Sequence, residues 1–159
     1  MLDKHYKVGL VIGRFQPFHN GHLYLIKEAL KLCDKLIIGI GSSNVINEDN
    51  PWDANKRRQI LGKVIKEEKL EDRIIKIVDI PDDSSDEVWY KTVLENAGEF
   101  DVWIGNNEWN EGIFKEHNIK VIVMPFWERY LHEGTKIRKL IKENGDWENR
   151  LPSYVVPFL

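Results

Sequence analysis

The stretch that most constrains the fold runs from Val8 to Leu23 and has the sequence VGLVIGRFQPFHNGHL. An uninterrupted apolar run ends at Gly13. A short basic turn follows, and then His19 and His22 open a helical pattern of apolar residues. Such a run is typical of a strand buried on both faces. A strand that leads through a loop into a helix start offers unpaired N–H groups and the positive end of the helix dipole. This stretch therefore predicts an anion-binding loop, in which Gly21 would let phosphate groups approach the backbone.

The rest of the chain repeats the alternation of strand and helix. Further strands are expected at about 35–41, 73–80, 100–106 and 119–125, and helices at about 20–33, 54–68, 87–96, 108–116 and 136–143. Asp53 and Thr135 are placed to cap the second and the last helix. This alternation predicts an α/β protein with a Rossmann-like, doubly wound, parallel five-stranded sheet. One domain is expected over residues 1–159, with 144–159 as a mostly irregular tail packed on it through Trp147, Leu151 and Val155.

Composition excludes several classes of protein. The formal net charge of -3 argues against a general nucleic-acid binder, which would carry a basic excess. Cys33 is the single cysteine, so neither an intramolecular disulfide nor a cysteine-based metal cluster is expected. The chain has no apolar leader at its start and no stretch approaching 18 apolar residues. We therefore expect a cytoplasmic protein that does not enter a membrane.

The candidate ligand-binding residues fall on one edge of the predicted sheet. In such sheets ligands bind at the carboxyl ends of the strands, near the switch in strand order. That edge collects the loops 13–22, 41–53, 80–86 and 105–107 and the approach to the last helix. This placement indicates a nucleotide or a similar phosphorylated ligand, without saying what is done to it.

Histidine and arginine residues are the candidates for phosphate contact. His19 and His22 lie three apart at a helix start, where both rings can face one spot and donate to a phosphate oxygen. Cap or surface histidines are the bland alternative, and a zinc site is a weaker one because no cysteine or carboxylate lies nearby. Arg14 follows Gly13 at the tip of the first strand, which favours a phosphate ligand over a solvated arginine. Arg57, at the start of a helix, could be merely solvated.

Several motifs together resemble a known superfamily. The segments GRFQPFHNGH, GSSN, NPW, KRRQIL and EGTKIRKLI occur in the order found in nucleotidyltransferases with HxGH and (S/T)xxR-type signatures. The first segment is similar to that of the archaeal-type nicotinamide-nucleotide (NMN) adenylyltransferases. The resemblance covers about residues 8 to 150. It implies condensation of ATP with NMN to give NAD and pyrophosphate, with Mg²⁺ accompanying the ATP, and it suggests a homo-oligomer.

The resemblance and the position on the rim together give a set of expected site residues. The catalytic set comprises His19, His22, Arg14, Arg57 and Arg138. The ATP-binding set comprises Gly13, Phe15, Gln16, Gly21, Gly105, Asn106 and Thr135. The acceptor-binding set comprises Ser42, Ser43, Asn50, Trp52, Asp82 and Trp89, where Trp89 matches an aromatic near the nicotinamide ring. No protein ligand set for a metal is expected, and the ion would be carried by the ATP phosphates.

The chain departs from the family pattern at several positions. Glu133 and Lys136 flank a Gly-Thr pair where the family commonly shows Ser-Gly-Thr-Glu, Lys56 replaces an acidic residue, and Asn107 replaces a proline. The helical extension typical of the family is shortened. These departures concern acceptor choice and subunit assembly more than adenylyl chemistry. Two alternatives therefore stay open, namely a sister enzyme with another phosphorylated acceptor, such as phosphopantetheine, and a nucleotide-sensing module.

Overall fold

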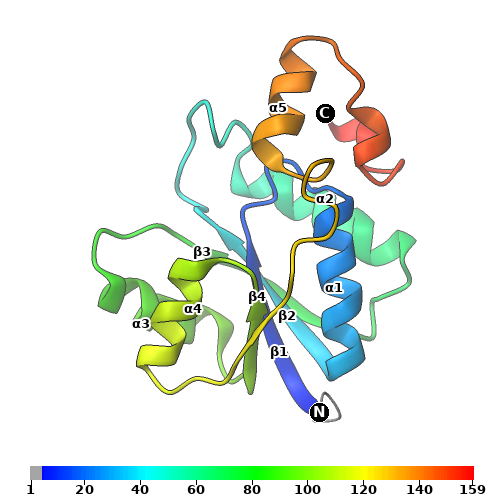
Figure 1. Ribbon diagram of the computed structural model, residues 1–159. Coiled ribbons are helices and arrows are strands. Elements are labelled where there is room, and N and C mark those ends of the chain that lie inside the picture. Colours follow the sequence, from blue (N-terminus) through cyan, green and yellow to red (C-terminus); the bar gives the residue numbers. More distant parts are fainter. Residues whose placement is uncertain (1–4) are drawn as a thin grey trace.

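A parallel sheet of five strands, covered by helices on both faces, forms the body of the protein in the computed structural model, which describes residues 5–159 (Figure 1). The strands are β1 (Tyr6–Gly13), β2 (Cys33–Gly41), β3 (Ile74–Ile80), β4 (Val102–Gly105) and β5 (Val121–Val123), and their order in the sheet is β3-β2-β1-β4-β5. All four neighbouring pairs are parallel. This arrangement confirms the predicted doubly wound fold.

The helices follow the predicted pattern closely. They are α1 (Asn20–Leu32), α2 (Ala54–Glu67), α3 (Asp86–Ala97), α4 (Glu108–Glu116) and α5 (Gly134–Lys142), and the tail holds two short 3-10 turns, Glu148–Arg150 and Val156–Phe158. The cap predicted for α2 is confirmed, because Asp53 Oδ1 accepts from Lys56 N at 2.7 Å. Helical spacing and capping residues were thus sufficient to place these elements.

The cap predicted for α5 is wrong. The helix begins at Gly134, one residue before Thr135, and its N-cap residue Glu133 makes no side-chain cap bond. Thr135 lies in the first turn, where its hydroxyl accepts from Arg138 Nη2 at 3.3 Å. The start of the helix is held instead by Arg138, which donates to the carbonyl of Gln16 at 2.7 Å. A tertiary contact therefore replaced the local capping preference.

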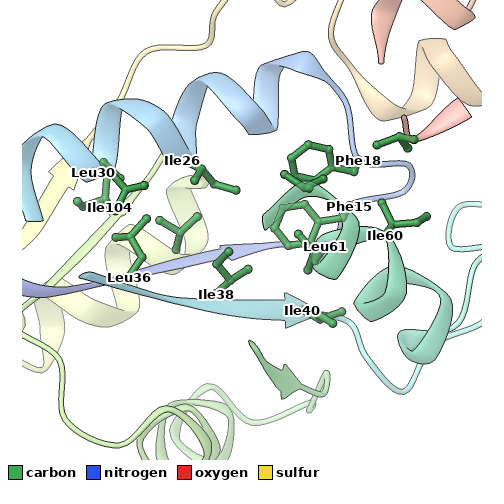
Figure 2. Packing of buried hydrophobic residues seen from close by; sticks show 14 of the residues in the cluster. Phe15, Phe18, Ile26, Leu30, Leu36, Ile38, Ile40, Ile60, Leu61 and Ile104 are labelled. Atoms are coloured by element: carbon green, nitrogen blue, oxygen red, sulfur yellow. The ribbon is translucent and has the colours of Figure 1, made fainter. Parts of the chain in front are cut away.

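Two apolar clusters, one on each face of the sheet, hold the layers together. Figure 2 shows the larger cluster, in which Phe15, Phe18, Ile26 and Leu61 pack between β1, β2, α1 and α2. The smaller cluster joins β1 and β4 to α3 and α4, with the fully buried Phe114 at its centre. Successive strand residues feed opposite clusters, as the two-residue period of a strand requires: Leu10 belongs to one, Val11 to the other. In the tail, Leu151 and Val155 are buried in the larger cluster and Trp147 packs against it.

The strand order places the ligand-binding edge. The connections from β1 to β2 to β3 move one way across the sheet, and the chain then returns past β1 to form β4. The switch point therefore lies between the carboxyl ends of β1 and β4, which is where open α/β sheets bind ligands. Among residues 5–159, no helix combines the length and the apolar character that a bilayer crossing requires.

Candidate active site

A cleft of about 410 Å³ opens at the switch point. The end of β1 forms its floor. The elements of its two walls, α1 on one side and α3 with α4 on the other, cover opposite faces of the sheet (Figure 1). One wall is the start of α1 with the 125–134 segment, and the other is the starts of α3 and α4 with the loop after β3. The volume falls within the usual range for a small-molecule site.

His19 and His22 use one ring nitrogen each to build the start of α1. Gly21 N donates to His19 Nδ1 at 3.1 Å, and His19 N donates to His22 Nδ1 at 3.1 Å. Because both Nδ1 atoms accept from backbone N–H groups, a neutral ring must carry its hydrogen on Nε2. The two rings are stacked with centroids 3.7 Å apart and both line the cleft. The pair therefore offers two Nε2–H donors at a helix N-terminus.

Burial keeps these imidazoles neutral. Desolvation, followed by the charge of Arg14 and the proximity of His132, lowers the pKa of His22 to about 3. Burial, followed by His22 and His132, also lowers the pKa of His19 well below its usual value. At neutral pH both rings are thus hydrogen-bond donors without a net charge. Each can donate its Nε2–H to an anionic oxygen while the ring itself stays uncharged.

Gly21 has a packing role besides the ligand-approach role expected from the sequence. A Cβ atom at this position would lie 2.9 Å from His19 Cε1 and 3.1 Å from His132 Cβ. The residue is therefore glycine because the His19 ring and the 125–134 segment occupy the space of a side chain. The missing side chain leaves room for the His19 ring, and it also leaves the backbone open to a ligand.

Arg14 supplies positive charge to the cleft. It is exposed and lines the cleft at the end of β1. Among the residues that the structure describes, no carboxylate lies within the 4.0 Å limit of an ion pair with its guanidinium. Its backbone carbonyl accepts from Arg57 Nη1 at 2.8 Å, which holds the loop beneath it. The guanidinium is thus available to a phosphate ligand.

Arg57 lies under the cleft and does not line it. Its side chain is 1% exposed, and its guanidinium donates to four backbone carbonyls. These belong to Arg14 (2.8 Å), Gly41 (2.7 Å), Ser42 (3.2 Å) and Asp53 (3.3 Å). They come from the loops after β1 and β2 and from the cap of α2. Arg57 thus joins these loops through its hydrogen bonds and lies away from the position expected for direct phosphate contact.

Gln16 and Arg138 form a second junction behind the cleft. The Gln16 side chain donates from Nε2 to Trp52 O at 2.9 Å and accepts from Trp52 N at 3.2 Å. Arg138 bonds the Gln16 carbonyl and lies 3.7 Å from Asp49. These contacts fix the histidine loop to the loop before α2 and to α5, so both side chains are occupied by the protein.

The wall formed by α3 and α4 carries acidic and aromatic side chains. Ser42 Oγ donates to Asp82 Oδ1 at 2.9 Å, which joins the loops after β2 and β3. Trp109 Nε1 donates to Asp86 Oδ1 at 3.2 Å, which joins α4 to α3. Trp89 lines the same wall and packs on Phe114 with ring centroids 5.8 Å apart. The cleft is therefore polarised, with donors at α1 and carboxylates with indoles at α3.

The expected site residues divide into two groups. The cleft brings together Arg14, His19, His22, Gly13, Phe15, Gly21, Asn106, Ser42, Asp82 and Trp89. Outside its lining lie Arg57, Arg138, Gln16, Gly105, Thr135, Ser43, Asn50 and Trp52. Four of the second group connect the loops behind the cleft, namely Arg57, Arg138, Gln16 and Trp52. Asn50 is turned inside its own loop, where its amide donates to Asn47 Oδ1 at 3.0 Å.

Sequence reasoning missed the residues that complete the walls. Those without an expected role include Tyr24, Trp109, Trp127, Arg129 and His132. Asp83, Asp86 and Asn107 were expected at this edge only as parts of the loops 80–86 and 105–107. His132 is 7% exposed and stacks on Trp127, with centroids 4.8 Å apart and planes 4° apart. Its ring also lies 6.2 Å from that of His19. Its place just before the EGTKIR segment was the one available signal.

The side chains that could ligate a metal do not gather into one group in the described part of the chain. Within residues 5–159, no group of three or more histidine, cysteine or carboxylate side chains is arranged to hold an ion.

Known proteins with this sequence pattern are nucleotidyltransferases. A family model described as cytidylyltransferase-like matches residues 10–149. A nicotinamide-nucleotide adenylyltransferase of Thermococcus kodakarensis is 31% identical over 154 residues, covering 96% of this chain and 82% of that protein. One of Methanococcus aeolicus is 36% identical over 148 residues, covering 92% of this chain and 84% of that protein.

A solved structure agrees with this assignment. A bifunctional NMN adenylyltransferase/ADP ribose pyrophosphatase of Francisella tularensis, complexed with AMP and a Mn ion, superposes with a TM-score of 0.72 at 25% identity. The match covers 92% of this chain and 44% of that longer one. Fold, cleft and relatives lead to one conclusion: the chain belongs to the cytidylyltransferase-like family and, within it, to the nicotinamide-nucleotide adenylyltransferases.

Proposed function

We propose that the cleft joins ATP to nicotinamide mononucleotide, giving NAD and pyrophosphate, with the triphosphate against His19, His22 and Arg14. The observation that carries this placement is the pair of Nδ1 caps, because it leaves two Nε2–H donors at the start of α1. The guanidinium of Arg14 lines the same part of the cleft. The adenine would lie toward Asn106 and the 125–134 segment. The acceptor ring would lie toward Trp89 on the opposite wall.

The reaction needs alignment more than acid–base chemistry. A phosphate monoester has a second pKa near 6, so the NMN phosphate is already a dianion at neutral pH and needs no general base. One of its oxygens attacks the α-phosphorus in line, and the new P–O bond forms as the bond from the α-phosphorus to the bridging oxygen breaks. The electron pair leaves with pyrophosphate. His19, His22 and Arg14 would neutralise the charge that builds on the transferred and leaving phosphates.

The divalent ion would enter as part of the nucleotide substrate, and we propose Mg²⁺ as that ion. When bound to the phosphates it would offset their negative charge. The chain's own residues would hold the complex through the α1 donors. We also propose that the protein works in the cytoplasm. We propose further that it is a homo-oligomer, and light scattering on the purified chain would test its oligomeric state.

Pyrophosphate release tests the reaction directly. The full chain is given MgATP and, in turn, NMN, phosphopantetheine and a sugar phosphate. Release with NMN is the expected result. Release only with another acceptor would identify a sister enzyme, and tight ATP binding without turnover would identify a sensor.

Replacing His22 tests the assigned roles. We expect His22→Ala to lower kcat by roughly 10²–10³, the usual scale for losing one oxyanion-type donor. His22→Asn offers an amide oxygen to His19 N and so preserves the helix start, but it places no donor at the Nε2 position. It should lose activity while remaining folded. His5→Ala, at an exposed site near the start of β1, is the matched control. Normal kcat in both His22 variants would refute the assignment.

A further inference from the structure

Two carboxylates on the α3 wall, those of Asp83 and Asp86, have no cationic partner. Within the described part of the chain, no lysine, arginine or histidine nitrogen lies within the 4.0 Å ion-pair limit of either. Asp83 Oδ1 accepts from Ser85 N at 2.9 Å, and Asp86 Oδ1 accepts from Trp109 Nε1 at 3.2 Å. Both acceptor bonds come from neutral donors, so the negative charge of this wall is not compensated.

The neighbouring Asp82 differs from these two. Its charge is one of those that favour the cationic form of the buried Arg57, although burial is the larger effect and lowers the pKa of that arginine. Asp82 also accepts from Ser42. It therefore belongs to the loop junction. Asp83 and Asp86 both line the cleft and face the space next to the indoles of Trp89 and Trp109.

Trp109 is an exposed indole with a fixed orientation. Its side chain is 65% exposed, yet its ring nitrogen is tied to Asp86 on the neighbouring helix. Trp89, in contrast, is half-buried against Phe114. Two indoles and two uncompensated carboxylates thus share one end of the cleft. This combination attracts a flat cation, through the ring faces and through charge, and repels an anion.

We propose that Asp83 and Asp86 make this enzyme select nicotinamide mononucleotide over nicotinate mononucleotide. This inference rests on the proposed function, which places the pyridine ring of the acceptor at the α3 wall. Both mononucleotides carry a cationic pyridinium ring. The nicotinate form adds a carboxylate to it, which cancels the attraction and meets the two carboxylates of the protein. The nicotinamide form has a neutral amide at that position, whose N–H groups can donate to a carboxylate.

The size of the effect follows from Coulomb's law. Two unit charges about 4 Å apart in water-like surroundings repel by about 1 kcal/mol, which is roughly a fivefold change in equilibrium. Both carboxylates are exposed, so the water-like value is the suitable one. Two such terms give a discrimination of about 25-fold in kcat/KM. Because the groups are solvated, the discrimination should shrink at about 1 M salt, where the screening length is about 3 Å.

The test compares kcat/KM for the two mononucleotides by pyrophosphate release from MgATP, using the full chain. Asp86→Asn is the sharpest variant, because its amide oxygen still accepts from Trp109 while the charge is gone. Asp83→Asn and the double variant complete the series. Asp72→Asn is the matched control, since it removes one exposed carboxylate before β3, at the opposite end of the strands.

The expected result is a wild-type preference for the nicotinamide form that falls about fivefold in each single variant and about 25-fold in the double variant. The change in the ratio should come mainly from slower use of the nicotinamide form, whose cationic ring loses the attraction, because in the nicotinate form lost attraction and lost repulsion offset each other. Asp72→Asn should keep the wild-type ratio. Equal use of both acceptors by the wild type, or an unchanged ratio in the double variant, would overturn the selectivity. Absence of turnover with either mononucleotide would instead overturn the proposed function, and this inference with it.

Discussion

Replacing Arg57 separates the two roles that the sequence and the structure give this residue. The family resemblance implies that this arginine, early in α2, belongs to the catalytic residues and handles phosphate. The structure shows a side chain that is 1% exposed and donates to four carbonyls in three segments. Arg57→Lys keeps the positive charge but has a single nitrogen, which cannot reach carbonyls that lie around a planar guanidinium. The substitution should therefore act on folding before it acts on phosphate binding.

The magnitude follows from the bonds that lysine cannot replace. A lysine ammonium that satisfied two of the carbonyls would leave two unpaired in a buried position. Each buried, unpaired carbonyl costs about 1–3 kcal/mol. Arg57→Lys should thus lower the free energy of unfolding by about 2–6 kcal/mol, a large part of the stability of a domain this size. The loops carrying Arg14 and Ser42 would loosen together, so kcat/KM for both substrates should fall as well.

Urea unfolding followed by tryptophan fluorescence measures the first effect, and pyrophosphate release measures the second. Arg58→Lys is the matched control in the same helix. Its guanidinium is half-buried and bonds Ile77 O at 2.8 Å and the Asp79 carboxylate, so its loss should cost less than about 1 kcal/mol. An Arg57→Lys protein with unchanged stability and a KM raised for ATP alone would refute the loop-joining role of Arg57 and support direct phosphate contact.

Two further predictions concern the histidine loop. Gly21→Ala should displace the ring of His19, because the new Cβ would lie 2.9 Å from it, and we expect a loss of about 1–3 kcal/mol in stability with a larger loss in kcat; wild-type kcat would contradict the close packing. The lowered pKa of His22 predicts acid sensitivity. In the unfolded chain this ring binds a proton below its ordinary pKa of 6.5, whereas in the native protein it stays neutral until the pH approaches its lowered pKa of about 3. Stability should therefore be retained above pH 6.5 and decrease as pH falls toward 3, by about 2 kcal/mol at pH 5 from this group. Urea unfolding at several pH values should show a flatter profile for His22→Asn, and parallel profiles would contradict it.

Local sequence patterns were sufficient for the elements and for the position of the site. The run Val8–Ile12, the alternation of apolar segments and the Asp53 cap act over a few residues, so the fold follows from them. Parallel strands then bring their carboxyl ends to one edge, which places Arg14 and His19 beside the loops 80–86 and 105–107. The role of Trp89 came only from the family resemblance.

What the sequence could not predict depends on contacts between distant segments. Arg57 and Arg138 are both arginines at helix starts near phosphate-binding motifs, so their local signals are those of ligand contacts. Their carbonyl partners lie 4 to 43 and 122 residues away in the chain, respectively, and only the folded loops reveal them. Trp109 reaches the cleft from a segment whose local sequence carries no ligand signature, and His132 is signalled only by its place just before the EGTKIR segment.

The spacing of the two histidines joins folding to chemistry at the start of α1. A Ser-x-x-Glu capping box would satisfy the same backbone N–H groups, and it would do so with side chains that have no N–H to give. Imidazole has two nitrogens on opposite sides of one ring, so Nδ1 of His19 and of His22 can cap the helix while Nε2 stays available. The cap also fixes the ring orientation and the tautomer, which a surface histidine would leave free. The sequence feature that predicts the helix start is therefore the same one that aims the two donors into the cleft.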